Sequence, residues 1–353
     1  MKIALLCDSH FGCRSDSKVF LEHQSRFFTD VFFPALEEYS VDTVLHLGDI
    51  FDRRKYINFF TLKRAKEFFF DELRDRNITM HAILGNHDTF YTTTNEVNSI
   101  ALLLNEYSNI HLYENAPVEL EFGLSKILMC PWLVKDTYAA SMKAIKSSTA
   151  NVLLGHFDLK GFEMMKGIVS DHGIDHREFS QFEAVYSGHY HHPSQHGNVK
   201  YLGAQYEMNW SDYGSKRGFY LLDSETRELT FIENHNIVYH KIDYDDTDLT
   251  IDEIASLDTS MLKDCHIKVI VKTRNNPYLY DMFLNRLNDC GAADVKSVED
   301  SLNLSDIGID TLMEEAKDTK YILHTYIDSV DTKVNKIRIK TVVDELYQEA
   351  LNL

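Results

Sequence analysis

The sequence has few of the residues that mark a disulfide scaffold, a disordered chain or a membrane protein. Among 353 residues there are five cysteines, five prolines and 15 glycines, and no two cysteines form a Cys-x-x-Cys pair. Scattered cysteines of odd number argue against a disulfide framework and against a thiolate metal site, so we expect reduced, mostly buried thiols. The apolar run at residues 1–7 ends at Asp8, far short of a signal-peptide core or a membrane span. We therefore expect a cytoplasmic protein with no membrane segment.

Positive charge is also scarce. The chain has 36 Lys and Arg against 55 Asp and Glu, which gives a net charge of −19. A protein that holds nucleic acid by itself is expected to be basic. Either the substrate is not a nucleic acid, or divalent cations, a local basic patch and a more basic partner supply the attraction. A candidate patch consists of Arg53, Arg54, Lys55, Lys63, Arg64 and Lys66, although charge alone favours a solvated helix face for it.

What the sequence does contain is a regular alternation of two kinds of segment. Apolar residues make up 44% of the chain and charged residues 26%, as in a globular protein. Short apolar runs predict buried strands that end in polar loops, while residues 17–39 and 59–76 have apolar residues at helical spacing. Such alternation predicts an α/β sandwich, followed by a partly antiparallel β region up to about residue 235. The five strand-and-loop segments are KIALLCDSH, TVLHLGDIFD, MHAILGNHD, NVLLGHFD and AVYSGHYHH.

The pattern of apolar and polar residues changes after about residue 237. An alternating strand around Ile267, a helix from Pro277 and a short strand near Val295 predict a small α+β unit. Residues 339–351 place their apolar side chains on one helical face. That face either packs on its own domain or docks on a partner.

Candidate chemistry lies at the ends of the five predicted strands. In α/β sheets the loops beyond strand ends assemble binding sites, so the side chains there are expected to converge. A single histidine on an apolar run is usually structural, but five such clusters in series are a specific signal. Mixed oxygen and nitrogen ligands without sulfur suit Mn²⁺, Fe²⁺ or Zn²⁺, and two such ions suit phosphoester hydrolysis. The seven candidate ligands are Asp8, His10, Asp49, Asn86, His156, His189 and His191.

These clusters resemble the five motifs of the calcineurin-like metallophosphoesterases. Within that superfamily the chain is most similar to the Mre-eleven/SbcD nucleases, especially their T-even-type phage members. The resemblance implies a four-layer α/β/β/α sandwich and, for a phage-encoded chain, the host cytoplasm. The motifs are Asp8-Ser9-His10, Gly48-Asp49-Ile50-Phe51-Asp52, Gly85-Asn86-His87-Asp88, Gly155-His156 and Gly188-His189-Tyr190-His191.

The resemblance also implies roles for individual residues. One ion is expected on Asp8, His10 and His191, and the other on Asn86, His156 and His189, with Asp49 as the bridge. Both ions are expected to be Mn²⁺, and hydrolysis is expected to proceed in line through a hydroxide that they share. His87 is left without a metal and corresponds to the family's general acid. Asp52 corresponds to a residue that orients this histidine in related phosphatases.

The family likeness further predicts domains and partners. Residues 1–236 correspond to the nuclease domain, 237–310 to a capping domain that shapes a DNA groove, and 311–353 to helices that bind an SMC-like ATPase of the Rad-fifty/SbcC type. A homodimer is also implied. Its candidate residues are Phe59, Phe60, Phe68, Phe69, Phe70 and the run 100–104, although core packing is the simpler explanation for most of them.

Three functions therefore remain open at this point. The first is a metal-dependent DNA nuclease, exonucleolytic on duplex ends and endonucleolytic on single strands. The second is a phosphatase or nucleotide phosphodiesterase, which the sequence Asp52-Arg53 superficially favours and which Asp88 disfavours, since protein phosphatases have glutamate there. The third is a non-catalytic scaffold, which the intact ligand set disfavours.

Overall fold

The computed structural model describes residues 1–165 and 167–299, together with 326, 327, 336, 338–340, 342 and 343. It divides into two compact units, and the larger one, Met1–Met208 with Asp212–Ser301, contains the sheets and all candidate metal ligands. The predicted C-terminal helices over 311–353 lie, apart from those few positions, outside the described residues. Within the described part of the chain, no helix has the length and apolarity needed to cross a membrane.

The first of two large sheets has six strands in the order β14-β13-β1-β2-β3-β4. Strands β1 to β4 run parallel to one another, while β13 pairs antiparallel with both β1 and β14. Their bounds are β1 (Lys2–Leu6), β2 (Thr43–His46), β3 (Thr79–Ile83), β4 (Ile110–Tyr113), β13 (Gly218–Asp223) and β14 (Leu229–Glu233).

The second sheet also has six strands, in the order β11-β12-β10-β7-β6-β5. Its centre is parallel, and antiparallel strands close both edges. The bounds are β5 (Val118–Phe122), β6 (Ser125–Cys130), β7 (Val152–His156), β10 (Ala184–Gly188), β11 (Ser194–His196) and β12 (Val199–Tyr201). The predicted partly antiparallel region is therefore shared between the two sheets.

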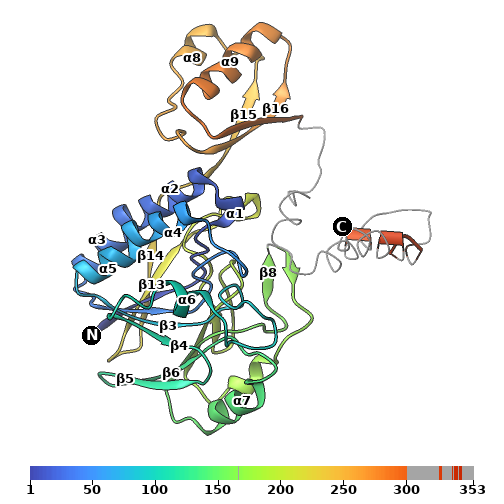
Figure 1. Cartoon of the computed structure of the whole chain (residues 1–353). Helices are drawn as coiled ribbons and strands as arrows, with labels where there is room; N and C mark the ends of the chain where they lie inside the picture. Colours follow the sequence, from blue (N-terminus) through green and yellow to red (C-terminus); the bar gives the residue numbers. More distant parts are fainter. Residues whose placement is uncertain (166, 300–325, 328–335, 337, 341, 344–353) are drawn as a thin grey trace. The chain divides into compact units, whose positions relative to one another are not determined.

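The two sheets pack face to face through an apolar core. Ile3 and Leu5 of β1 meet Ile127 of β6 and Leu154 of β7 in this core, because alternate residues of a strand point to the same side. Helices cover both outer faces, which gives the predicted α/β/β/α layers (Figure 1). On the second sheet the cover is α7 (Tyr138–Ser147).

The helical layer on the first sheet consists of two long bent segments. They occupy the predicted ranges 17–39 and 59–76 and lie side by side in Figure 1. Phenylalanine rings fill the space below them, with Phe32 placed 4.9 Å from Phe219 of β13 and 6.0 Å from Phe69 between ring centroids. The segments comprise α2 (Lys18–Arg26), η1 (Phe27–Phe32) and α3 (Phe33–Glu38), then α4 (Phe59–Ala65), η2 (Lys66–Phe70) and α5 (Asp71–Asp75).

The small α+β unit after residue 237 has its own core. Its parallel sheet has the order β15-β16-β17, and apolar residues of α8 and α9 pack on it. The bounds are β15 (Tyr239–Asp245), α8 (Ile251–Ala255), β16 (His266–Thr273), α9 (Pro277–Asp289) and β17 (Asp294–Glu299). The predicted strand, helix and strand correspond to β16, α9 and β17, whereas β15 and α8 were not foreseen.

The remaining short elements connect these layers. They are α1 (Cys13–Asp16), α6 (Ser99–Leu103), β8 (Glu163–Met165), β9 (Ile168–Val169), η3 (His176–Phe179) and η4 (Trp210–Asp212).

The five cysteines are free thiols, and four of them are buried, as expected from the sequence.

Candidate metal centre

The candidate ligands converge because they follow the carboxyl ends of five parallel strands. Three of these strands, β1, β2 and β3, belong to the first sheet, and two, β7 and β10, belong to the second. Parallel neighbours end at the same edge, so each sheet presents its clusters on one side. Ligand atoms of three residue groups then lie within 4.8 Å of one another. The groups are Asp8, His10 and His191; His10, Asp49 and His87; and Asp49, His156 and His189.

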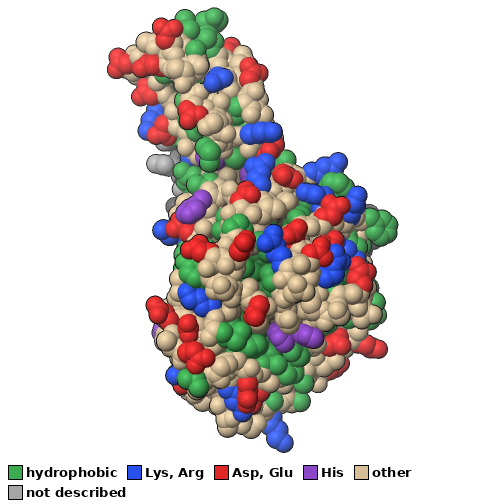
Figure 2. Space-filling model, turned by 90° about the vertical axis from the view of Figure 1, so that its left-hand side faces the viewer, with side chains coloured by type: hydrophobic (Ala, Val, Ile, Leu, Met, Phe, Trp, Pro, Cys, Tyr) green, Lys and Arg blue, Asp and Glu red, His purple; other side chains and the backbone are tan. Residues whose placement is uncertain are grey.

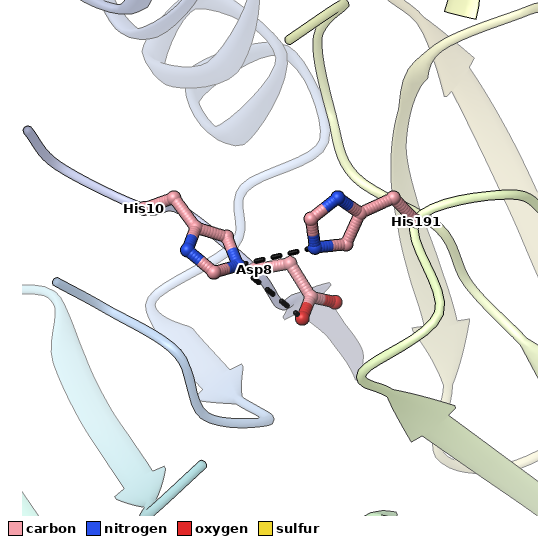
Figure 3. Close-up of side chains that lie close together, drawn as sticks. All are labelled: Asp8, His10 and His191. Atoms are coloured by element: carbon pink, nitrogen blue, oxygen red, sulfur yellow. Dashed lines mark hydrogen bonds and ion pairs between the residues drawn. The ribbon is translucent and has the colours of Figure 1, made fainter. Parts of the chain in front are cut away.

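The first group brings together Asp8 and His10 from the loop after β1 and His191 from the loop after β10 (Figure 3). The Nε2 atoms of His10 and His191 lie 3.1 Å apart, and an oxygen of Asp8 lies 4.0 Å from Nε2 of His10. Burial lowers the pKa of His10, but the hydrogen bond to Asp52 and the charge of Asp49 outweigh it and raise the pKa to about 9. Burial and the neighbouring His10 lower the pKa of His191 to about 4. The acidic groups around His10 that raise its pKa would also favour a cation between the two rings.

A second ligand group, as predicted from the sequence, adds Asn86 to His156 and His189. The amide oxygen of Asn86 lies 2.9 Å from Nε2 of His156 and 2.9 Å from Nδ1 of His189. On its other side, Nδ1 of His156 lies 2.7 Å from the carbonyl oxygen of Leu47 and donates to it. This bond fixes the tautomer, because it leaves the Nε2 lone pair facing the cluster, as in metal-bound histidines. The donor set thus fits a divalent ion.

Asp49 lies between the two groups. One of its carboxylate oxygens is 3.3 Å from Nε2 of His156 and 3.6 Å from Nε2 of His10, so it faces both sides. The other oxygen accepts the peptide N–H of His87 at 2.6 Å. The side chain is almost fully buried. A carboxylate in this position has the geometry of a bridge between two ions.

His87 is partly exposed, with 26% of its side chain accessible, and His189 and His191 are partly exposed as well. Its Nδ1 donates to the backbone carbonyl of Asp52, and its Nε2 lies 4.0 Å from Asp49. The Asp52 carboxylate contacts a different histidine, since its oxygen lies 3.2 Å from Nδ1 of His10. In this structure Asp52 therefore orients a candidate metal ligand through its side chain and His87 through its main chain.

The backbone at the candidate ligands is strained. Asp8, His10, Asp49 and His189 all have positive φ, at 52°, 42°, 55° and 93°. Few residues other than glycine adopt this region, and such positions concentrate at functional sites. The strain is held by the surrounding fold, which indicates that these side chains are kept in place for a purpose other than packing.

Asp88 provides part of that support and was not assigned a role from the sequence. Its carboxylate accepts N–H groups from Asp49 at 2.8 Å, Ile50 at 3.0 Å and Gly85 at 2.9 Å. Burial and the neighbouring charge of Asp49 raise its pKa to about 7, while the N–H donors oppose that rise. Asp88 thus ties together the loops after β2 and β3.

A second supporting network holds the loop after β1. Nε2 of Gln24 donates to the carbonyls of Ser9 at 3.1 Å and His10 at 3.2 Å, and the hydroxyl of Tyr206 also donates to Ser9. The Ser9 hydroxyl lies 2.8 Å from Nε2 of His46, whose pKa burial lowers to about 3, so this ring is neutral.

The loop after β10 is held from behind by a buried arginine. Arg217, only 3% exposed, donates to the carbonyl of His191 and, at 2.5 Å, to the carboxylate of Asp212. A buried guanidinium is tolerated only when it is paired and hydrogen-bonded in this way. Gln24, Tyr206 and Arg217 lie far from the motifs in sequence, whereas Asp88 occupies a motif position that could have signalled its role.

Gly85→Ala should abolish metal binding through a steric effect. A Cβ at Gly85 would lie 2.2 Å from a carboxylate oxygen of Asp49 and 2.4 Å from its backbone nitrogen, so the bridge must move. A displacement of about 1 Å can cost on the order of 100-fold in rate, which we expect here as a minimum. Calorimetric titration with Mn²⁺ and a hydrolysis assay measure both effects. The matched control is Gly161→Ala, which has nothing within 4 Å but a φ of 86°; if both variants lose activity equally, crowding of Asp49 is not the cause.

Comparisons with known proteins agree with this geometry. Residues 1–170 match the family model of the calcineurin-like phosphoesterase superfamily domain. Exonuclease subunit 1 of Enterobacteria phage T4 is 33% identical over 247 residues, which cover 69% of this chain and 71% of that protein. The SbcD subunit of the SbcCD nuclease from Staphylococcus saprophyticus is 22% identical over 255 residues, covering 65% of this chain and 67% of that protein.

A solved archaeal phosphodiesterase aligns with 66% of this chain and 100% of its own length, at 16% identity and a TM-score of 0.34. The assignment rests on the sequence relatives instead. The chain belongs to the calcineurin-like phosphoesterases, in the Mre-eleven/SbcD nuclease family, and is a metal-dependent phosphodiesterase.

Proposed function

We propose that this chain is the nuclease component of a DNA recombination and repair complex, acting on duplex ends and single strands. The observation that carries the proposal is the pair of adjoining ligand groups that share Asp49, with His87 exposed beside them. The two sequence relatives, both named as parts of nucleases, support DNA as the substrate.

Seven residues are proposed to hold two Mn²⁺ ions. Asp8, His10 and His191 hold one; Asn86, His156 and His189 hold the other; Asp49 contacts both. Ions at such a site polarise the phosphoryl oxygens and lower the pKa of water. The protein itself would hold these seven ligands on strained loops that buried hydrogen bonds support, so that little reorganisation is needed during the reaction.

His87 is proposed as the general acid for the leaving oxygen. Its Nδ1–H is engaged by the Asp52 carbonyl, so the ring presents Nε2 to the substrate side. Partial exposure suits a group that must meet substrate, and an imidazole titrates near neutral pH. We propose that Asp52 positions both His87 and His10 rather than transferring a proton itself.

The acidic net charge requires a local explanation. Figure 2 shows Lys and Arg interspersed with Asp and Glu on the displayed face, with no continuous basic stripe. Most of the candidate basic patch is neutralised, since Lys63 and Arg64 pair with Glu67 and Lys66 pairs with Glu106. Lys63, Arg64 and Lys66 therefore form a solvated helix face, which is the interpretation that the charge pattern of the sequence favoured.

Two members of that patch remain available for DNA. Among the described residues, no carboxylate forms an ion pair with Arg54 or Lys55, and the buried Nε of Arg54 has no hydrogen-bond partner. Both residues line a small open pocket of about 120 Å³ together with Tyr56 and Phe90. A guanidinium and an ammonium next to aromatic rings suit the phosphates and bases of a nucleic-acid strand.

Arg54→Ala and Lys55→Ala should each weaken DNA binding and lower the slope of log affinity against log salt concentration by about one. The physical reason is that one fewer counterion is released on DNA binding for each phosphate contact that is removed. Fluorescence anisotropy with a labelled oligonucleotide at several salt concentrations measures the slope. Lys63→Ala, which removes an exposed lysine already paired with Glu67, is the control. An unchanged slope in both test variants would place the DNA elsewhere.

Two partners are part of the proposal. An SMC-like ATPase would bind through residues 311–353; the names of both relatives, each called a subunit, support the existence of a partner. If the ATPase still co-purified after removal of the residues beyond Lys333, this assignment would be contradicted.

A homodimer would form through Phe59, Phe60 and Leu102, which are 86%, 46% and 71% exposed, whereas Phe68, Phe69 and Phe70 are core residues. Light scattering of Phe59→Glu tests that contact.

One digestion experiment tests the function as a whole. End-labelled duplex and single-stranded DNA are incubated with the chain and Mn²⁺, with para-nitrophenyl phosphate and a phosphopeptide in parallel. Release of nucleotides or oligonucleotides supports a nuclease. Hydrolysis of the two monoesters with intact DNA would favour the phosphatase alternative instead.

A further inference from the structure

A tryptophan stands beside the second ligand group without being part of it. Trp132 follows β6, and its ring centroid lies 5.3 Å from that of His189 and 5.8 Å from that of His156. Its side chain is only partly buried, although the preceding Pro131 and the neighbouring His156 are both buried. An apolar ring of this size that reaches solvent next to a metal centre is available to a ligand.

The backbone fixes Trp132 without help from its indole. Its peptide N–H donates to the carbonyl of Leu84 at 2.8 Å, directly before the loop that carries Asn86. Its carbonyl accepts from Nδ2 of Asn95 at 3.2 Å, and the same amide group also donates to the carbonyl of Glu114. Asn95 is 1% exposed, so this anchor is rigid. Main-chain hydrogen bonds thus hold the loop, and the indole ring is not needed for that role.

We propose that Trp132 is a specificity-determining residue, on whose indole the base or sugar next to the scissile phosphate rests. This inference rests on the proposed nuclease function. Indole rings stack on nucleobases of every kind, because each base has a π face, so the contact selects nucleic acid without selecting sequence. It would distinguish a nucleotide chain from other phosphoesters at a metal centre that recognises only the phosphate.

The alternative is that the indole merely supports the imidazoles of His156 and His189. The two explanations make different predictions. A supporting ring affects every substrate alike, because it acts on the metal ligands. A stacking ring affects only substrates that carry a base, and it changes KM more than kcat.

The experiment uses a single-stranded oligonucleotide with one cleavable linkage, all others being phosphorothioates, and an identical one with abasic residues on both sides of that linkage. For the full chain with Mn²⁺ we expect KM to be roughly 5- to 150-fold higher on the abasic substrate, the range given by base–aromatic stacking. In Trp132→Leu, the KM for the normal substrate should rise by the same factor, and the KM for the abasic substrate should not change. Trp132→Phe should keep most of the affinity, and Tyr138→Leu, at an exposed aromatic residue of α7, should change neither substrate.

Equal KM values of the unaltered chain on both oligonucleotides would overturn the inference without any variant. So would an equal loss on both substrates in Trp132→Leu, which would assign the ring a supporting role. A chain that cleaves neither oligonucleotide but hydrolyses bis-para-nitrophenyl phosphate would instead overturn the proposed nuclease function, and this inference with it.

Discussion

Asp49→Asn is expected to lose binding of both metal ions and to slow DNA cleavage by about 1,000-fold or more. The amide keeps the shape of the side chain and the bond from the His87 peptide N–H, but it removes the charge that lies 3.3 Å from His156 and 3.6 Å from His10. Metal ions supply several kcal/mol of transition-state stabilisation, and each 1.36 kcal/mol is a factor of about ten in rate. Calorimetric titration with Mn²⁺ and a single-turnover assay measure the two effects.

The near-isosteric change separates loss of function from loss of fold. The control is Asp42→Asn, an exposed carboxylate directly before β2 that takes no part in the cluster. It should retain both ions and full activity. Two tight Mn²⁺ sites in Asp49→Asn would show that Asp49 does not bridge, even if activity were low.

His87→Asn is expected to retain both metal ions and DNA affinity while cleavage falls by about 100- to 10,000-fold, the contribution typical of general acid catalysis. The asparagine can still donate to the Asp52 carbonyl, so the loop should keep its conformation, but it has no group that can transfer a proton to a leaving oxygen. Since proton donation matters only in the transition state, the loss should fall on kcat rather than KM.

A substrate with a better leaving group provides the internal check. A para-nitrophenyl ester of a nucleotide needs little protonation of its leaving oxygen, so His87→Asn should affect it much less than natural DNA. The control is His111→Asn, an exposed histidine of β4. Equal losses on both substrates would assign His87 to metal binding, a role that its distance of 4.0 Å from Asp49 also permits.

The convergence of the ligands could be predicted from the sequence because parallel strands share an edge. Each cluster follows an apolar run of strand length, and the structure places all seven candidate ligands and His87 in one group of contacts. The two helical stretches and β16, α9 and β17 were predictable because the period of apolar residues depends on local backbone geometry, whereas β15 and α8 were not foreseen.

The supporting contacts could not be predicted, because they join residues distant in sequence. Nothing local marks Arg217 as the donor to His191, or Trp132 as the neighbour of His189. The role of Asp52 also depends on a choice that only the fold makes, namely which of two nearby histidines its carboxylate faces. The expected Mn²⁺ ions, the domain boundaries and the ATPase contact stay predictions.

The division of the ligands between two sheets affects when the enzyme becomes active during synthesis. The first 150 residues supply Asp8, His10, Asp49 and Asn86, whereas His156, His189 and His191 emerge later, and β13 and β14 then complete the edge of the first sheet beside β1. Domains fold from the N-terminus as the ribosome releases them. A chain that ends before β7 therefore lacks three of the seven proposed ligands, so we expect it to be unable to cleave a phosphodiester.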